Sequence, residues 1–322
     1  MVIFKFAVSA VLLYLLLRGH DPAHLLEVLQ RADRPLLAIA AGIYWCVALP
    51  SALRWSIVVR VLGHSLRFGR SLLLILVGYF FNQTLLSSIG GDGMRMWMVY
   101  RAGLPGAVSV AGVLIDRIMQ YVAHMLLVAA ALPVIFGMIP DWGVRAPVLL
   151  LLAASAGGLA FAATADHLPQ RLAGLLPMTF IQSLSVGLRR ILLAPRWLGL
   201  TVILGLANQI GGFVVVALLA RALNLPITWG QCLAVAPIAL LMTALPISVG
   251  GWGVREGAFV AGFNFVGVPA SDALALSVVF GLVMMVVRLP GGLIWLAVGD
   301  NLPKSGRRPP CGPRELGGIS GK

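Results

Sequence analysis

The sequence predicts an all-α polytopic membrane protein with about six full membrane spans and two broken re-entrant helical hairpins that form an inverted repeat. Composition predicts the class, because 60% of the 322 residues are hydrophobic and only 11% are charged. Soluble domains carry about 25% charged residues. The mean hydropathy of +0.97 agrees. Long apolar runs predict helices, and a glycine-rich motif that occurs twice predicts the repeat.

Each element of this fold corresponds to an apolar segment. A spanning helix needs ~20 mostly apolar residues, because the hydrocarbon is ~30 Å thick and each residue rises ~1.5 Å. The first segment is expected to remain as a helix, since no small-residue cleavage site follows it before Arg18. The segments are 2–17, 36–53, 71–86, 108–136, 147–164, 197–219, 229–249, 257–268 and 273–298.

The net charge of +13 is interpreted as a signal of membrane topology. Basic residues lie mainly between the apolar segments, in connections 54–70 and 171–196 and in the tail 304–322. Cytoplasmic loops accumulate Lys and Arg, and such loops also meet anionic headgroups. We therefore expect a multi-pass protein of the bacterial cytoplasmic (inner) membrane with both termini in the cytoplasm and no nucleic acid partner.

The charge pattern also predicts a segment that enters the membrane without crossing it. If every apolar segment except 257–268 crossed once, the connector 167–196 would lie outside, against the rule for basic loops. The rule is satisfied if 71–86 enters, breaks at Gly90–Gly91 and returns to its own side. One connection resists this assignment, because its arginines then face outward: Arg18, Arg31 and Arg34.

The second half of the chain gives the opposite arrangement. Segment 229–249 enters from outside, breaks at Gly250–Gly251 and returns outward through 257–268. Matching elements that enter from opposite faces are typical of inverted-repeat transporters, whose substrate sites lie near the midplane at discontinuous helices.

We expect one transmembrane domain over residues 1–301, with repeat halves of roughly 36–165 and 197–301. The basic connector 167–196 between them is either a set of amphipathic helices on an anionic leaflet or an ordinary cytoplasmic loop. The tail 302–322 is rich in Pro, Gly and Arg and is expected to be disordered.

The repeated motif is S-[IV]-G-G-x-G-x-R, written SIGGDGMR up to Arg95 and SVGGWGVR up to Arg255. A Gly-Leu-Pro or Gly-Val-Pro follows each copy. Glycine pairs allow sharp turns and leave backbone N–H groups exposed, and bare backbone at membrane depth is tolerated only inside protein or beside a wet cavity. The pairs are Gly90–Gly91 and Gly250–Gly251.

These features predict a site for a lipid phosphate that is built from two halves. Helix N-termini that follow the glycines would aim N–H donors at an anion, and the planar guanidinium groups of Arg95 and Arg255 suit phosphate oxygens. The alternative is structural: glycine-rich turns can simply connect helices, and arginines near a membrane boundary can snorkel to the interface.

Other polar residues in apolar surroundings are candidates for the same site. Ionisable groups within a membrane are costly, so Asp92 and Glu256 either serve transport or pair architecturally with the neighbouring arginines. Asp116–Arg117 invites the same two interpretations, whereas the isolated Arg288 needs a carboxylate or a lipid phosphate as partner. Amides either line a cavity or join helices. The amide residues that are candidates are Asn82, in the run Asn82 to Thr84, and Asn208–Gln209. His124 is expected to make an interhelical hydrogen bond.

No motif indicates an enzyme. A G-x-x-x-x-G-K-[ST] loop, an H-E-x-x-H pair and a G-x-S-x-G elbow do not occur, and the 11 acidic residues are scattered. The three cysteines lack the spacing of metal ligands. We expect no catalytic residue, no metal site and no cofactor.

Several stretches resemble the transmembrane domain of bacterial lysylphosphatidylglycerol synthases, a family that also includes stand-alone membrane proteins. They run through nearly the whole chain, and the block 246–256 is the most specific. The first motif departs from a common family form, because Ser87–Ser88 stands where that form has Pro before the glycine. The other stretches are Leu53-Arg54-Trp55, Leu62-Gly63, Gly90-Gly91-Asp92 with Arg95, Asp116-Arg117 and Arg288-Leu289-Pro290-Gly291.

The resemblance implies a flippase-like domain, which in full-length members moves an aminoacylated phospholipid made by a cytosolic domain. This chain is expected to be a stand-alone member that translocates a phospholipid or a related anionic or isoprenoid lipid, with Arg95, Arg255 and Arg288 on its phosphate. The alternative is a non-transporting membrane partner of a lipid-modifying or glycosyltransferase enzyme. A membrane transferase is the third hypothesis.

Overall fold

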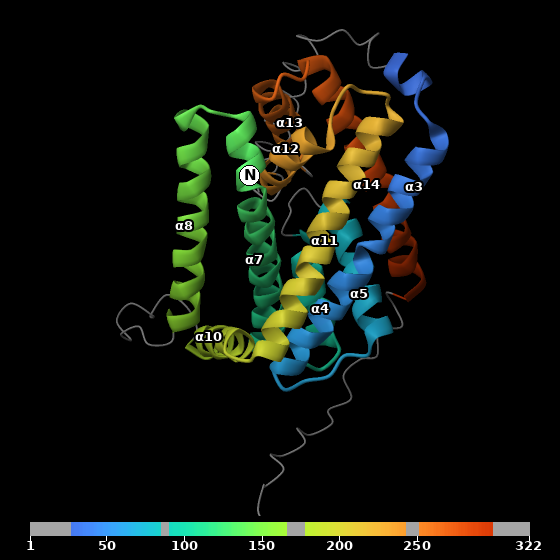
Figure 1. The fold of residues 1–322 in the computed structure, drawn as a ribbon. Coiled ribbons are helices and arrows are strands. Elements are labelled where there is room, and N and C mark those ends of the chain that lie inside the picture. Colours follow the sequence, from blue (N-terminus) through green and yellow to red (C-terminus); the bar gives the residue numbers. More distant parts are fainter. Residues whose placement is uncertain (1–26, 85–89, 166–177, 243–250, 299–322) are drawn as a thin grey trace, which may run out of the picture.

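A computed structural model describes residues 27–84, 90–165, 178–242 and 251–298. Within these ranges the chain forms helices and no strand (Figure 1). Those long and apolar enough to span a bilayer are Arg34–Val61, Gly106–Met138, Trp142–Thr164, Pro195–Ala222 and Ala270–Ala297. The prediction of an all-α polytopic membrane protein is therefore confirmed. The predicted first span 2–17 and the tail 302–322 lie outside the described residues.

The first long span consists of two helices, α3 (Arg34–Cys46) and α4 (Ala48–Val61), joined at Val47. It begins where the Asp33 carboxylate accepts a hydrogen bond from the Leu36 N–H at 3.1 Å, an N-cap that satisfies one of the free N–H groups of the first turn. The other spans are α7 (Gly106–Met138), α8 (Trp142–Thr164), α11 (Pro195–Ala222) and α14 (Ala270–Val298).

Two shorter helices, α5 (Phe68–Thr84) and α6 (Gly90–Arg101), form an antiparallel hairpin around the first motif. The Gly91 N–H donates to Asn82 Oδ1 at 2.9 Å. A Cβ built on Gly91 would lie 1.9 Å from the Gly78 carbonyl oxygen, so only glycine permits this approach of the two backbones.

A second antiparallel hairpin surrounds the second motif and consists of α12 (Trp229–Met242) and α13 (Val254–Phe265). Gln231 Nε2 donates to the Val266 carbonyl at 2.9 Å, and Gly262 faces Val235. Residues early in α12 thus contact residues late in α13. The predicted return segment 257–268 begins three residues earlier than expected, because Glu256 caps the helix within its first turn.

The open ends of the two hairpins lie at opposite ends of α7. Gly112, near the start of α7, lies beside Leu62, which precedes α5, while Gly230 at the start of α12 lies beside Met138 at the end of α7. The 33 residues of α7 cover about 50 Å, so the two hairpins begin about a bilayer thickness apart. Figure 1 shows α12 and α13 at one end of the bundle and α10 at the other.

The two hairpins also end alike. α6 and α13 have 12 residues each and are followed by Gly103 and Gly267, whose φ angles are +99° and +78°. Each glycine N–H donates three residues back and the next N–H donates five residues back, a Schellman closure. A long helix, α7 or α14, follows in both cases. The two hairpins therefore end in the same local structure, although the motif copies themselves differ: the first is helical from Gly90, and the second forms a turn at Gly251 and Gly253 before α13 begins.

The equivalence extends upstream of the motif. The stretch R-V-L-G-H-S-L-R-F-G, residues 60–69, corresponds to R-A-L-N-L-P-I-T-W-G, residues 221–230. Gly63 and Asn224 occupy the same place with φ angles of +85° and +54°, and both close their helices with the same pair of backbone hydrogen bonds. The units α4–α7 and α11–α14 are thus matching sets of elements, a correspondence that the sequence carries and that was missed from the motif alone.

The connector contains α10 (Met178–Leu192), which lies across one end of the bundle (Figure 1). Ile181, Leu188 and Ile191 on one face are buried, while Arg190 is exposed. This arrangement favours the amphipathic-helix interpretation over the loop for residues 178–192. Residues 166–177 lie outside the described part of the chain.

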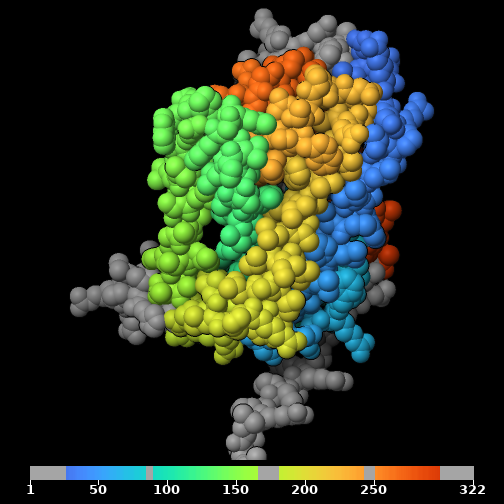
Figure 2. Space-filling model, in the orientation of Figure 1, coloured from blue at the N-terminus to red at the C-terminus, as the bar shows by residue number. Residues whose placement is uncertain are grey.

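Helix α8 is the least covered of the spans. Only Val148 and Ala163 are buried, and Leu150 and Phe161 are 69% and 62% exposed. Figure 2 shows α8 set apart from α7 over part of its length. Apolar side chains that are exposed in this way are suited to lipid rather than to water.

Candidate functional site

A cavity of about 220 Å³ lies in the middle of the bundle. Its lining comes from every labelled helix except α8 and α10, and includes residues 116–124 of α7, 208–212 of α11 and 280–288 of α14. These stretches lie near the middle of each helix, so the cavity lies about halfway along the candidate spans. Among the described residues, no group of three or more His, Cys, Asp or Glu side chains could hold a metal ion.

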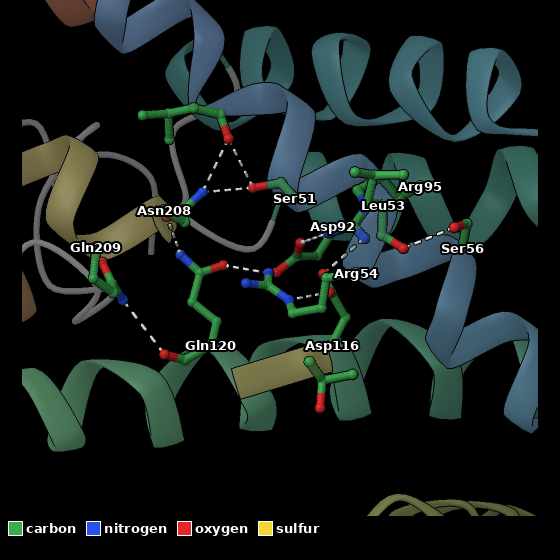
Figure 3. A network of polar contacts seen from close by, with 12 residues as sticks. Ser51, Leu53, Arg54, Ser56, Asp92, Arg95, Asp116, Gln120, Asn208 and Gln209 are labelled. Atoms are coloured by element: carbon green, nitrogen blue, oxygen red, sulfur yellow. Dashed lines mark hydrogen bonds and ion pairs between the residues drawn. The ribbon is translucent and has the colours of Figure 1, made fainter. Parts of the chain in front are cut away.

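The first motif contributes to a cluster of five charged side chains, four of which are buried, while the fifth, Arg117, is partly exposed. Asp116 Oδ1 accepts from Arg54 Nε at 2.8 Å, and its Oδ2 accepts from Arg95 Nη2 at 3.0 Å (Figure 3). Asp92 accepts two hydrogen bonds from Arg117, at 2.7 and 2.9 Å, and lies 3.5 Å from Arg95 Nη1. Both carboxylates are therefore held between guanidinium groups.

These ion pairs differ from the pairs expected between charged residues that are close in the sequence. Asp92 pairs chiefly with Arg117 rather than with Arg95, and Asp116 pairs with arginines of α4 and α6 rather than with its neighbour. Adjacent side chains on a helix point about 100° apart, so Asp116 and Arg117 cannot face each other.

A chain of neutral polar groups extends from Arg54 across the cavity. Arg54 Nη2 donates to Gln120 Oε1 at 2.7 Å, and Gln120 Nε2 donates to Asn208 Oδ1 at 3.4 Å (Figure 3). Asn208 Nδ2 donates to Ser51 Oγ at 2.6 Å, and Ser51 shares a 2.9 Å hydrogen bond with the Tyr79 hydroxyl. This chain joins α4, α5, α7 and α11, and it leaves these polar groups satisfied at membrane depth.

The second motif forms a smaller cluster. Arg255 Nε donates to Glu256 Oε1 at 3.0 Å, its Nη2 makes a second contact with that oxygen, and Ser277 joins the pair. Glu256 Oε2 accepts from the Gly253 N–H at 2.6 Å. One N–H at the N-terminus of α13 is thus bound by the protein's own carboxylate, and the idea that this N-terminus aims its other donors at a ligand anion stays a prediction. Gly251 and Gly253 have positive φ angles, of +82° and +87°.

Each motif arginine lies against a glycine of another helix. A Cβ on Gly78 would lie 2.8 Å from Arg95 Cδ, and a Cβ on Gly281 would lie 2.1 Å from Arg255 Nη2. The two glycines leave the space that the buried arginine side chains occupy. Their role depends on packing between helices and was missed in the sequence.

Each motif arginine also lies over an indole ring. The Arg95 guanidinium carbon is 4.1 Å from the centre of the Trp55 ring, and that of Arg255 is 4.5 Å from the Trp252 ring. Cation–π contacts of this kind stabilise a guanidinium group away from water.

Arg288 lines the same cavity with neutral partners. It donates from Nη1 to Gln83 Oε1 and from Nη2 to the Tyr44 hydroxyl, both at 3.0 Å. Its guanidinium carbon is 6.0 Å from the Tyr44 ring and 5.6 Å from the Tyr79 ring. In the described part of the chain it makes no ion pair with a carboxylate, so its charge is stabilised only by dipoles and π faces.

The charges around the cavity do not balance. Five arginines face three carboxylates, which leaves a net charge of +2 within an apolar bundle. The segments 85–89 and 243–250, which connect the hairpin helices, contain no acidic residue in their sequence. The groups counted are Arg54, Arg95, Arg117, Arg255 and Arg288 with Asp92, Asp116 and Glu256.

Four of these arginines also keep an unsatisfied nitrogen. Within the described residues, each of the following buried atoms has no hydrogen-bond partner: Arg54 Nη1, Arg95 Nε, Arg255 Nη1 and Arg288 Nε. Buried donors without partners are costly, and the cost is greater for charged groups. The guanidinium groups around the cavity are therefore incompletely compensated by the protein itself.

Half of the predicted site residues line this cavity. Its lining includes Asn82, Arg95, Asp116, Arg117, Arg255 and Arg288. Asp92 and Glu256 are not part of the lining but pair with arginines that are. Gly90 and Gly91 begin α6, and Gly251 lies in the turn before α13. Gly250 lies outside the described residues. His124 makes the expected interhelical hydrogen bond, with Nε2 donating to the Pro237 carbonyl at 2.6 Å.

The prediction for Arg54 is wrong, because the basic connection 54–70 was expected to face the cytoplasm. Helix α4 continues to Val61, and Arg54 is fully buried within it. Asp116 and Gln120 hold this guanidinium inside the bundle, so the drop in hydropathy at Arg54 does not mark a helix end. The sequence signal that could have placed it is Trp55 and the apolar run that continues after it.

Comparison with known families relates the chain to a described membrane domain. A sequence model described as "Lysylphosphatidylglycerol synthase TM region" matches residues 2–292. This match relates the chain to membrane proteins of lipid metabolism or transport. No curated protein matches the chain.

Proposed function

The chain belongs to the lysylphosphatidylglycerol synthase transmembrane family, and from this premise we propose that it is a lipid translocator that moves a phosphate-bearing lipid between the leaflets of the bacterial inner membrane. The observation that carries the proposal is the cavity at mid-depth with its net charge of +2. A phosphate is the part of a lipid that the hydrocarbon excludes most strongly, and a fixed excess of guanidinium charge offsets that exclusion.

The excess charge lies on two sides of Tyr79. Its hydroxyl belongs to the polar chain that leads to Arg54, and its ring faces Arg288 at 5.6 Å. The first cluster carries three arginines and two carboxylates, and Arg288 has no carboxylate partner in the described part of the chain. We propose that the phosphate is held between Arg288 and the pair Arg54–Arg95.

The lining of the cavity limits what suits it. Most of the lining side chains are polar or charged, which suits a headgroup rather than acyl chains. In the proposed mechanism the headgroup passes through the protein, and the acyl chains remain in the bilayer beside it.

The hairpins supply the architecture for such a passage. We propose that α5–α6 and α12–α13 are re-entrant hairpins of an inverted repeat, since they open at opposite ends of α7 and close with the same backbone pattern. Inverted repeats place the substrate site where the two halves meet, and alternating access follows from movement of one half against the other.

The distribution of surface charge supports an orientation for this repeat. At the α10 end the described residues include seven arginines and no carboxylate, whereas the opposite end carries both signs. Basic ends face the cytoplasm. We propose that the α10 end is cytoplasmic and that both termini lie on that side. The seven are Arg60, Arg67, Arg70, Arg101, Arg189, Arg190 and Arg196.

We propose transport rather than chemistry as the activity. The three carboxylates at the cavity accept hydrogen bonds from guanidinium groups, and a carboxylate held in this way is a poor general base. The proposal therefore needs neither a cofactor nor a metal ion.

A second candidate is a membrane partner that recruits a lipid-modifying enzyme and transports nothing. The observation in its favour is α8, whose apolar surface is left almost uncovered by the rest of the chain. Under this alternative the buried arginines only stabilise the bundle.

Reconstitution tests the two against each other. Purified protein in vesicles would be supplied with acyl-labelled fluorescent phospholipids and with polyprenyl phosphates, and loss of fluorescence to a membrane-impermeant quencher would report movement between leaflets. Faster movement of at least one phosphate-bearing lipid than in protein-free vesicles supports the translocator. Movement of none of them would leave the recruiting partner as the better account.

A further inference from the structure

We infer that His124 is a proton-binding site of the cavity and that its ring takes up a proton when a phosphate group occupies the cavity. The ligand of this site is the proton, which places one further positive charge beside the bound anion. This inference rests on the proposed function, because it concerns the occupied form of the same cavity. The place of His124 in the repeat and the geometry of its ring carry it.

His124 occupies the place in the first half of the chain that Arg288 occupies in the second half. Both lie 21 positions after the glycine that closes the preceding hairpin, Gly103 for His124 and Gly267 for Arg288. Both side chains line the cavity. Each binds the first helix of the other half's hairpin, since His124 contacts α12 and Arg288 contacts α5. The repeat thus sets a side chain that can titrate against one that is permanently charged.

His124 is the lining side chain whose charge can change near neutral pH. Arginine stays protonated in this range, and the tyrosine hydroxyl ionises only near about pH 10. The carboxylates at the cavity are held in their ionised form by the guanidinium groups that bind them. An unperturbed imidazole titrates near about pH 6.5. Among the described residues of the lining, proton binding therefore falls to His124.

The hydrogen bonds of the ring identify the atom that takes the proton. Nε2 lies 2.6 Å from the Pro237 carbonyl oxygen, which can only accept, so Nε2 carries a hydrogen in both forms of the ring. The neutral ring then has its lone pair on Nδ1. The Gln209 side chain also hydrogen-bonds to the ring. Its Nε2 is directed to the Gln120 carbonyl at 3.4 Å, which leaves Oε1 as the acceptor that suits a protonated Nδ1.

Two effects oppose a charge on this ring as long as no anion is bound. The side chain is only 6% exposed, and burial disfavours the charged form. The net charge of +2 around the cavity repels a further cation. Helix α11 has no ionisable side chain between Arg196 and Arg221. The titratable groups around the ring are Asp116, Arg117 and Tyr121 of α7 and Cys232 of α12, with Arg54, Arg95, Arg255 and Arg288 across the cavity.

A phosphate in the cavity reverses this balance. One negative charge reduces the net charge around the ring, and its attraction to an imidazolium favours the protonated form. The protonated ring can donate to both of its acceptors, the Pro237 carbonyl and the Gln209 amide, whereas the neutral ring can donate to only one. Proton and phosphate therefore favour each other's binding. The argument needs only the phosphate and applies whether or not the rest of the headgroup carries an amine.

Proton uptake on mixing protein and lipid tests the inference. The full chain in weakly buffered detergent near about pH 6.5 would receive phosphatidylglycerol, whose phosphodiester does not titrate in this range, and an indicator dye would report the protons taken up. Diacylglycerol with the same acyl chains is the control without phosphate. Phosphatidylglycerol should cause an uptake that approaches one proton per protein, and diacylglycerol should cause none. Absence of uptake in the wild-type protein overturns the inference.

His124→Gln isolates the ring. The glutamine Nε2 can still donate to the Pro237 carbonyl but takes up no proton, so the uptake should disappear from a folded protein. His64→Gln, in the turn before α5, is the matched control and should leave the uptake unchanged. Uptake that persists in His124→Gln overturns the inference.

A complementary variant covers the case in which His124→Gln does not fold. It keeps His124 and carries glutamine in place of the other four histidines of the chain. This variant should retain the full uptake, because none of the four lines the cavity. Loss of the uptake in the folded variant would assign it to another histidine and overturn the inference. The four positions are His20, His24, His64 and His167.

Lipid binding measures the same linkage from the other side. Binding of phosphatidylglycerol would be titrated at about pH 7.5 and about pH 5.5, and bound lipid would be quantified by mass spectrometry. The protonated ring attracts the phosphate, so the affinity should rise about tenfold as the pH falls, and linkage to one proton limits the rise to about a hundredfold. His124→Gln should bind equally well at both pH values. Equal affinity of the wild-type protein at the two pH values contradicts the inference.

These measurements concern binding and therefore separate this inference from the proposed function. Proton uptake that depends on His124 supports the inference even if no lipid moves between leaflets, in which case only the proposed function fails. Movement of lipid without uptake that depends on His124 leaves the proposed function standing and overturns the inference.

Discussion

The Arg95 guanidinium and the Asp116 carboxylate, 21 positions apart in the chain, meet at 3.0 Å between Nη2 and Oδ2 in the middle of the bundle. Arg54 binds the other oxygen of the same carboxylate at 2.8 Å. One buried carboxylate thus ties the motif helix α6 to α4 and α7. The arginine that the repeated motif presents is fixed by a residue outside the motif.

Loss of the Asp116 charge should destabilise the whole bundle. Asp116→Asn leaves Arg54 and Arg95 buried without their shared counter-charge, and breaking a buried pair costs about 3–5 kcal/mol. Thermal unfolding of the purified protein in detergent measures the effect. Asp141→Asn is the matched control, since Asp141 caps α8 at the molecular surface and asparagine is an equally good N-cap. Similar melting temperatures for the two variants would contradict the central role of Asp116.

Arg255 leaves no room for a side chain at Gly281, so one added methyl group there should lower the stability of the protein. Gly281→Ala would place Cβ 2.1 Å from Arg255 Nη2, so the guanidinium group must move and weaken its bonds to Glu256. Overpacking of this kind costs typically 1–3 kcal/mol. The melting temperature should fall.

Gly257 provides the control for that substitution. It lies in α13, two residues after Arg255, and a Cβ there meets no atom within 4 Å. Gly257→Ala should be neutral or should stabilise the protein by up to ~1 kcal/mol, because alanine is the better helix former. A larger loss of stability from Gly257→Ala than from Gly281→Ala would refute the close contact as the cause.

If the two hairpins are equivalent parts of an inverted repeat, the turns that precede them should be accessible from opposite sides of the membrane. In a background whose cysteines are replaced by serine, His64→Cys and Leu225→Cys would be labelled with a membrane-impermeant thiol reagent in intact and in permeabilised cells. The two positions follow Gly63 and Asn224, which close their helices alike. We expect labelling of Leu225→Cys in intact cells and of His64→Cys only after permeabilisation. Labelling of both from the same side would exclude the inverted repeat.

The sequence predicted the class of fold and most of the charged residues of the cavity for a simple physical reason. Long apolar runs leave a helix in lipid as the only stable structure, and a charge such as Arg288 within such a run must find a polar interior. The glycine pairs lie close to the helix starts that the structure describes: α6 begins at Gly90, and Gly251 lies in the turn before α13.

The partners of each charge could not be predicted in the same way. Arg54 and Asp116 are 62 positions apart, and nothing local to either identifies the other. The need for glycine at Gly78 and Gly281 depends on which helices come together. Arg54 was placed in a loop because a charge at the end of an apolar run is typical of a membrane boundary, and only the tertiary contact with Asp116 overrides that pattern.

The central claim, that the cavity arginines hold a lipid phosphate during its passage, is tested most directly by comparing Arg288→Gln with Arg196→Gln in reconstituted vesicles. Both remove one arginine, but Arg288 lines the cavity and Arg196 is exposed at the α10 end. We predict that Arg288→Gln, folded with an unchanged elution profile, moves fluorescent phosphatidylglycerol at least about tenfold more slowly, as expected for the loss of one desolvated charge-assisted contact. Arg196→Gln should move it at the wild-type rate. Equal rates for the two variants would contradict the account.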